Sequence, residues 1–270
     1  MIRLCGGPAL LELSSQGCDL GQLEGLTTWS STSRCIDPWS QSVCIDLRLS
    51  DDVDTEHYRS RFIDYIEFPN LEWRRASRYL RLSLPRRLNQ YGCWTMTLAH
   101  RHALLAGLVA ASQGSNWRCL HGALVVLEDQ SAVVIVGHSG AGKSTLARRL
   151  GGDVRGDEIV ALRSSNEGVW VRGTAIPGEL ACRDFTAHQL RAVIVPEHGD
   201  EPECVITPVT PAESVKNILD AVVRFEPNRL IDDFIWLDEW LPTIPVCRFR
   251  WRLQGQLPYS GLAHWLRSLS

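Results

Sequence analysis

The residues best suited to chemistry lie in one glycine-rich stretch, GHSGAGKS, at residues 137–144. It matches the phosphate-binding pattern G-x-x-x-x-G-K-[ST] at every fixed position. In such a loop, backbone N–H groups hold phosphate oxygens, the lysine reaches the β- and γ-phosphates, and the next hydroxyl binds Mg²⁺. We therefore expect Lys143 and Ser144 to take these two roles. The predicted nucleotide-binding residues are Gly137, His138, Ser139, Gly140, Ala141, Gly142, Lys143, Ser144 and Thr145.

The flanking residues predict the strand and the helix that such a loop requires. Residues 132–136 are apolar and β-prone, and residues 143–150 place Leu146 and Leu150 one helical turn apart before two glycines. A second apolar strand, residues 122–127, precedes the first by about four residues. Because a parallel connection needs a dozen or more residues, the two strands must form an antiparallel hairpin. This hairpin argues against switch-like GTPases and many ATPases, which place a parallel strand beside the loop strand.

The hairpin also brings a histidine towards the loop. With a turn centred between Asp129 and Gln130, residues whose numbers sum to about 259 face each other, so His121 would lie opposite His138. A histidine beside a γ-phosphate could neutralise charge or direct a proton. The alternative is a structural histidine that caps the end of the strand.

Two acidic residues, Asp157 and Glu158, follow the helix at the point where the chain should have come back level with the loop. The helix rises about 10–12 Å at 1.5 Å per residue, and an extended chain comes back at about 3.3 Å per residue. Neighbours in a strand point to opposite faces, so we expect one role for each. Asp157 could accept a proton from an attacking hydroxyl, and Glu158 could bind the metal directly or through water. The alternative is an exposed acidic turn. The predicted metal ligands are Ser144, Asp157 and Glu158.

These residues together resemble the catalytic half of bacterial HPr kinase/phosphorylase. The shorter HPr-kinase-like proteins of peptide-maturation gene clusters look more similar still, and some of those phosphorylate a serine of a lasso-type precursor peptide. The family carries an Asp-Asp pair where this chain has Asp157-Glu158, and an acidic or small residue where it has His138. The match covers about residues 98–220 and rests on His121-Gly122, the GHSGAGKST loop and Gly156-Asp157-Glu158-Ile159-Val160.

The resemblance implies an α/β fold related to HPr kinase and phosphoenolpyruvate carboxykinase, with ATP and Mg²⁺ as cofactors. It implies Asp157 as general base, Ser144 as Mg²⁺ ligand and His121 as a neighbour of the γ-phosphate. Arg172-Gly173 loosely resembles a later signature of the family, which makes Arg172 a candidate substrate- or phosphate-facing residue. Because relatives of this family form hexamers, a homo-oligomer is a further expectation.

The first third of the chain predicts a separate β-rich region. Residues 44–50 and 78–85 alternate apolar and polar side chains, and we place a domain boundary near residue 95. The expected organisation is a β-rich region at 1–95, which could recognise substrate, and a P-loop catalytic domain at 96–270. A cluster of arginines in the first region is either a dock for an acidic peptide or phosphate, or the solvated face of a half-buried sheet. They are Arg74, Arg75, Arg78, Arg81, Arg86 and Arg87.

The pattern beyond residue 95 predicts further elements. Residues 98–112 and 260–269 read as helices, and residues 191–197 and 245–253 read as strands. A helix at 210–219 has Thr210 as N-cap, Pro211 at its first position and Glu213 completing a capping box.

The whole-chain composition limits partners and location. A formal net charge of −3 over 270 residues gives no reason to expect nucleic-acid binding. The nine cysteines include no C-x-x-C pair, which favours free thiols in a reducing cytoplasm. The N-terminal residues lack the clean apolar region that predicts a signal peptide, and no run approaches the ~18 apolar residues of a membrane helix. We therefore expect a cytoplasmic protein without a membrane partner.

These features predict an ATP- and Mg²⁺-dependent kinase that phosphorylates a hydroxyl, above all serine, in a peptide or small protein. Two alternatives remain open. The acceptor could be a small hydroxylated metabolite, or the chain could be a nucleotide-binding partner subunit that recognises a peptide without catalysis.

Overall fold

The computed structural model divides the chain into two compact units. One comprises Met1–Trp117 with Val223–Glu226, and the other comprises Arg118–Val222 with Pro227–Ser270. The boundary predicted near residue 95 lies outside the described residues and stays a prediction. The structure describes residues 2–5, 9–16, 41–50, 71–74, 79–85, 116–174, 186–199, 204–224 and 230–252, together with Val109, Ile176, Gly178 and Trp265.

The N-terminal unit contains a five-stranded mixed sheet. Its strands lie in the order β1-β2-β3-β5-β4; β2, β3 and β5 run parallel, and β1 and β4 are antiparallel to their neighbours. The strands predicted at 44–50 and 78–85 are confirmed as parts of β3 and β5. Of the six arginines, Arg74 and Arg81 lie in described strands, where Glu72 faces Arg81. The bounds are β1 (Ile2–Cys5), β2 (Ala9–Gln16), β3 (Gln41–Ser50), β4 (Leu71–Arg74) and β5 (Tyr79–Pro85).

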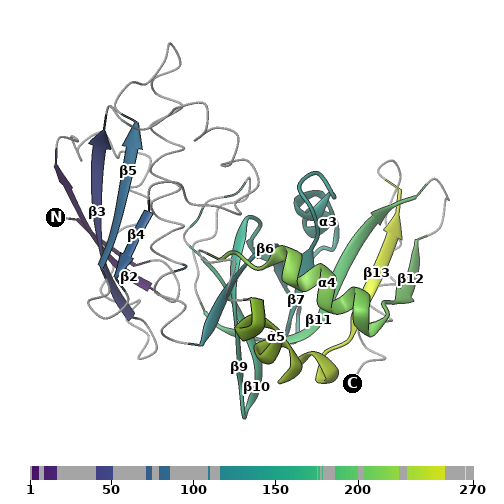
Figure 1. Ribbon diagram of the computed structural model, residues 1–270. Helices are drawn as coiled ribbons and strands as arrows, with labels where there is room; N and C mark the ends of the chain where they lie inside the picture. The colour runs from purple at the N-terminus through teal and green to yellow at the C-terminus, as the bar shows by residue number, and fades with distance from the viewer. Residues whose placement is uncertain are drawn as a thin grey trace. The chain divides into compact units, whose positions relative to one another are not determined.

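The second unit is a mixed α/β structure built on an eight-stranded sheet (Figure 1). The strand order is β10-β9-β6-β7-β11-β13-β12, with β8 beside β6. Because β10 also pairs with β11, the pairings among β6, β7, β11, β10 and β9 close into a ring. The bounds are β6 (Trp117–Val126), β7 (Ala132–Val136), β8 (Asp153–Gly156), β9 (Ile159–Ser165), β10 (Gly168–Gly173), β11 (His188–His198), β12 (Val205–Pro208) and β13 (Val246–Trp251).

The predicted antiparallel hairpin is confirmed as β6 and β7, with a register one residue different from the expected one. Facing residues such as Gly122 and Val136 have numbers that sum to 258, because the turn centres on Asp129. The Asp129 carboxylate holds that turn by accepting hydrogen bonds from the Ser131 backbone N–H at 3.0 Å and hydroxyl at 2.6 Å. Continued by one residue, this register places His121 opposite Gly137. The prediction that His121 faces His138 is therefore wrong by one residue.

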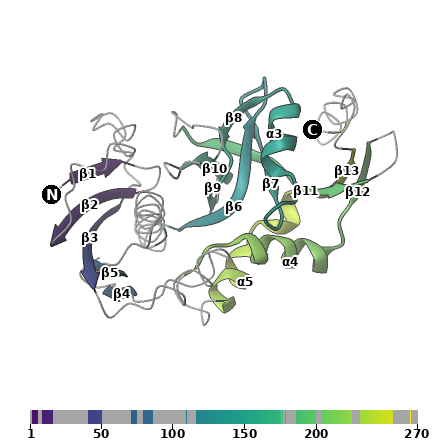
Figure 2. The same ribbon diagram turned by 90° about the horizontal axis from the view of Figure 1, so that it is seen from above.

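Helices cover both faces of the sheet. Figure 2 shows α3 (Lys143–Arg149) on one side of β7 and β11, and α4 (Pro211–Ala221) with α5 (Leu230–Asp238) on the other. All five residues of β7 are buried, and alternate ones serve the two faces. Val133 and Ile135 pack with Leu146 of α3, whereas Val134 and Val136 share a cluster with helices α4 and α5. Each such burial stabilises the fold by about 1.5–3 kcal/mol, so the strand before the loop is held firmly from both sides.

The helix predicted at 210–219 is confirmed as α4, including its capping box. The Thr210 hydroxyl accepts a hydrogen bond from the Glu213 backbone N–H at 3.4 Å, and a Glu213 carboxylate oxygen accepts one from the Thr210 backbone N–H at 3.3 Å. Hydrogen bonds from the Thr210 hydroxyl and Arg248 lower the pKa of the Glu213 carboxyl. The helices predicted at 98–112 and 260–269 lie outside the described residues, apart from Val109 and Trp265. No helix in the described ranges is long and apolar enough to cross a membrane.

Helix α5 was not predicted from the sequence. Its outward face carries large apolar side chains beside the exposed Asp232 and Asp238, since Ile231 is 70% exposed and Ile235 is 60% exposed. Its inward residues Trp236 and Leu237 are buried in the core cluster beneath α4. The usual contrast between a polar outer face and an apolar inner face is therefore weak.

Candidate active site

The loop of residues 137–142 lies at the carboxyl end of β7 and leads into α3. Gly140 has φ +79° and Gly142 has φ +86°, in the left-handed region that favours glycine. The two positions differ in their surroundings. A side chain at Gly140 would meet nothing within 4 Å, whereas one at Gly142 would stand 3.0 Å from His198 Cε1 and 3.2 Å from Trp251 Cζ2. One part of the loop is thus open, and the other is packed against the strands beside it.

Lys143, the first residue of α3, is almost completely buried under this loop, with 6% of its surface exposed. Its ammonium donates hydrogen bonds of 3.0 Å to the carbonyl oxygens of both Gly137 and His138. Burial lowers the pKa of Lys143, and the negative charge of Glu158 partly opposes that shift. The loop carbonyls and Glu158 therefore support a buried cation at the point where the motif predicts one.

His138 is exposed on the loop. Its Nδ1 lies 2.7 Å from the carbonyl oxygen of Ser139. Because a carbonyl oxygen can only accept, Nδ1 carries the hydrogen of this bond. Nε2 is then the nitrogen left to meet a ligand or solvent.

Asp157 and Glu158 occupy the turn between β8 and β9, so the expectation that both lie in a strand is wrong. Strand β8 pairs with β6 as far as Gly156, and the Gly122 backbone N–H then donates to the Glu158 carbonyl at 3.1 Å. This bond places His121-Gly122 against the acidic turn. Asp157 is 3% exposed, which excludes a solvated acidic turn at that residue. Glu158 is half-buried, and its negative charge interacts with the Lys143 ammonium.

The end of β10 approaches the same turn. Arg172 is 2% exposed and pairs in register with Ala161 of β9. The next residue, Gly173, brings its Cα within 3.5 Å of where a Cβ at Gly156 would stand. Arg172 therefore belongs to the strand that forms the second wall of the acidic turn.

Two residues beside the loop, His198 and Trp251, were not predicted from the sequence. His198 ends β11 and faces Trp251 at the end of β13, with their ring centroids 5.6 Å apart. The Arg149 guanidinium of α3 lies 5.3 Å from the centroid of the Trp251 ring. The strand before His198 was predicted, but only the fold shows that β11 is the parallel neighbour of β7. Carboxyl ends of parallel neighbours meet at one edge, which is where ligands bind in open α/β sheets.

The described part of the chain holds no group of three or more His, Cys, Asp or Glu side chains that could bind a metal by themselves. Mg²⁺ in phosphate-transfer sites is usually held by one or two protein oxygens together with the phosphates. The half-buried Ser144 and Glu158 fit this smaller set.

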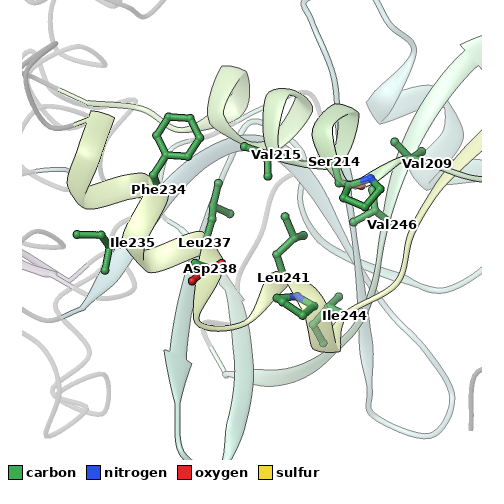
Figure 3. Close-up of a pocket in the computed structure, with 12 residues that line it drawn as sticks. Val209, Ser214, Val215, Phe234, Ile235, Leu237, Asp238, Leu241, Ile244 and Val246 are labelled. Carbon is green, nitrogen blue, oxygen red and sulfur yellow. The ribbon is translucent and has the colours of Figure 1, made fainter.

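A separate groove of about 680 Å³ lies between α4, α5 and the 3₁₀ helix η5 (Leu241–Thr243) (Figure 3). Its walls are mainly apolar, with Val215, Leu237 and Leu241 pointing into it. Among the described lining residues Asp238 is the one charged side chain. A groove lined without lysine or arginine does not suit phosphate.

Comparisons with known proteins do not place the chain in a family. No family model and no curated protein sequence matches it. Among solved structures it matches the Hpr(Ser) kinase/phosphatase from Coxiella burnetii at 14% identity, over 56% of this chain and 88% of that chain. The TM-score of 0.28 is too low to establish a common fold.

Proposed function

We propose that this chain is an ATP- and Mg²⁺-dependent phosphotransferase that moves the γ-phosphoryl group to a serine hydroxyl of a peptide or small protein. The observation that carries the proposal is the meeting of two motifs distant in the sequence. The acidic turn at Asp157-Glu158 adjoins the phosphate loop through the charge interaction between Glu158 and Lys143. A buried carboxylate beside a phosphate loop suits transfer to a hydroxyl, because the hydroxyl must lose its proton.

Each residue then has a stated task. Lys143 has three donor hydrogens and uses two on loop carbonyls, so its third is directed to a phosphate oxygen. Ser144 and Glu158 would hold Mg²⁺, with Asp157 as the predicted second carboxylate, and the bound metal would neutralise phosphate charge. His121 is proposed as a neighbour of the γ-phosphate, because the hydrogen bond from Gly122 to Glu158 joins its strand to the acidic turn, and Arg172 of β10 is proposed as a substrate- or phosphate-facing residue.

The transfer itself is one displacement. The acceptor oxygen bonds to the γ-phosphorus while the bond from that phosphorus to the β-phosphate bridging oxygen breaks. The hydroxyl proton passes to the Asp157 carboxylate, and ADP departs. Little covalent chemistry falls to the protein, which positions the groups and stabilises charge.

The test follows γ-labelled ATP with Mg²⁺, the purified protein and a desalted lysate of its source. Asp157→Asn should keep nucleotide affinity and lose transfer by about 10²–10⁴-fold, the usual contribution of a general base. Lys143→Ala should lose both. The matched control is Asp153→Asn in the same segment, because that carboxylate is 59% exposed and ion-paired with Arg155. It should transfer as the wild type does.

The outcomes separate the three functions. Label in an acid-stable peptide or protein phosphoester, with wild type and Asp153→Asn alone, supports the proposal. Label in a small metabolite would make the chain a metabolite kinase. Nucleotide binding with no labelled acceptor would favour the non-catalytic subunit, and full transfer by Asp157→Asn would exclude Asp157 as the base.

A further inference from the structure

Gly178 lies directly against the carboxyl group of Asp157, a contact between residues 21 positions apart. A Cβ built on Gly178 would stand 2.5 Å from Asp157 Cγ and 2.9 Å from Oδ2, and closer still to Oδ1. Non-bonded carbon and oxygen atoms do not approach so closely. The Asp157 carboxylate thus occupies the space that any side chain at position 178 would need.

Hydrogen bonds and a strand pairing also connect residues before Gly178 to residues beside the acidic turn. The buried Thr174 hydroxyl donates a 2.7 Å hydrogen bond to the carbonyl of Ile159, the residue after Glu158. The same hydroxyl accepts a 3.4 Å hydrogen bond from the Ile176 backbone N–H, and Ile176 is buried. Gly173 faces Val160 in the strand pairing. These contacts tie Thr174 and Ile176 to the strand that follows the turn carrying Asp157.

We infer that Gly178 is a positioning residue for Asp157: its missing side chain sets the direction in which the buried carboxylate points. The inference rests on the proposed function only in taking Asp157 as the base. A methyl group at position 178 must displace the carboxylate or the backbone beneath it. Proton abstraction needs the base within hydrogen-bond reach of the acceptor, so such a displacement lowers the rate of transfer rather than nucleotide affinity.

The contact is tested first by stability, without reference to activity. Gly178→Ala should lower Tm, and the same substitution in an Asp157→Ala background should lower it much less, because the methyl then fits where the carboxylate was. Such non-additivity is the signature of residues in contact. The control is Gly140→Ala, whose Cβ would meet nothing within 4 Å and so does not contact Asp157. Its effect should add to that of Asp157→Ala. Equal losses of Tm for Gly178→Ala in both backgrounds would overturn the contact.

The positioning role is tested by transfer from ATP to the labelled acceptor. Gly178→Ala should lower kcat at least about tenfold with KM for ATP unchanged, and should add no further loss in the Asp157→Asn background. A further loss there, or an unchanged kcat, would overturn the positioning role even if the stability cycle shows the contact. Full transfer by Asp157→Asn would overturn the proposed base and the positioning role together, while the stability cycle would still report on the contact.

Discussion

Replacing Gly142 by alanine tests how firmly the phosphate loop is packed against the neighbouring strands. The substitution has two costs in the structure. Gly142 adopts φ +86°, and its new Cβ would stand 3.0 Å from His198 Cε1 and 3.2 Å from Trp251 Cζ2. Gly140 in the same loop has a similar φ of +79° but nothing within 4 Å, so Gly140→Ala pays the backbone cost alone. The pair of variants therefore isolates the packing cost.

The left-handed backbone costs an alanine about 1–2 kcal/mol, which is the loss expected for Gly140→Ala. Overpacking typically adds about 1–3 kcal/mol. We expect the lower part of that range for Gly142→Ala, because the exposed His198 ring can turn away. Trp251 is 1% exposed and cannot move as easily, so the added cost does not vanish. The expected total for Gly142→Ala is about 2–4 kcal/mol.

The assay is equilibrium denaturation of both variants, followed by Gly142→Ala in a His198→Ala background. Removing the imidazole should recover part of the added cost and leave the share due to Trp251. Equal destabilisation by Gly140→Ala and Gly142→Ala would refute the packing argument. No recovery in the His198→Ala background would refute the assignment of the contact to His198.

Four more outcomes follow from side chains in the second unit. Thr210→Ala should destabilise the protein by about 1 kcal/mol in denaturant titrations, because it removes the α4 cap. The Glu213 contribution to that cap should be complete above the ordinary carboxyl pKa of 4.5 and should be lost progressively as the pH falls below it through the lowered folded pKa. Comparing the pH dependence of stability with that of Glu213→Gln checks this. Glu158→Gln should lower the pKa of Lys143 further. As the pH is raised, Lys143 should therefore lose its proton, and ATP binding measured in EDTA should be lost, at a lower pH than in the wild type. Burial raises the pKa of Cys247 to about 12, so native protein treated with iodoacetamide at pH 8 should be unlabelled at that residue by mass spectrometry, and labelled after unfolding.

The local parts of the candidate site were predictable from sequence because their signals are local. The phosphate loop is a contiguous motif, and its neighbours Ala132–Val136 carry the apolar run of a buried strand. The antiparallel hairpin followed from the short connection alone. Its register was wrong by one residue, since residues 127–131 allow more than one turn centre and only the Asp129 contacts select among them.

The parts that could not be predicted depend on contacts between distant segments or on an unusual surface. Nothing near Gly178 in the sequence points to Asp157, and nothing near His198 points to Gly142. Helix α5 was not predicted because Ile231 and Ile235 are apolar at positions where an exposed helix face is normally polar. In each case the side chain's surroundings are decided by tertiary packing, on which a sequence pattern carries little information.

The parallel pairing of β7 with β11 has a consequence for how the site is assembled during synthesis. Val134 and its partner Val193 are 59 positions apart, and both the phosphate loop and the acidic turn lie between them. Pairing across such a separation is slow compared with the local hairpins on either side of it. A nascent chain that has released β7 and α3 from the ribosome still lacks His198 and Trp251, against which Gly142 packs. The packed form of the loop at residues 137–142 therefore belongs to a late stage of folding, when nearly the whole chain has been made.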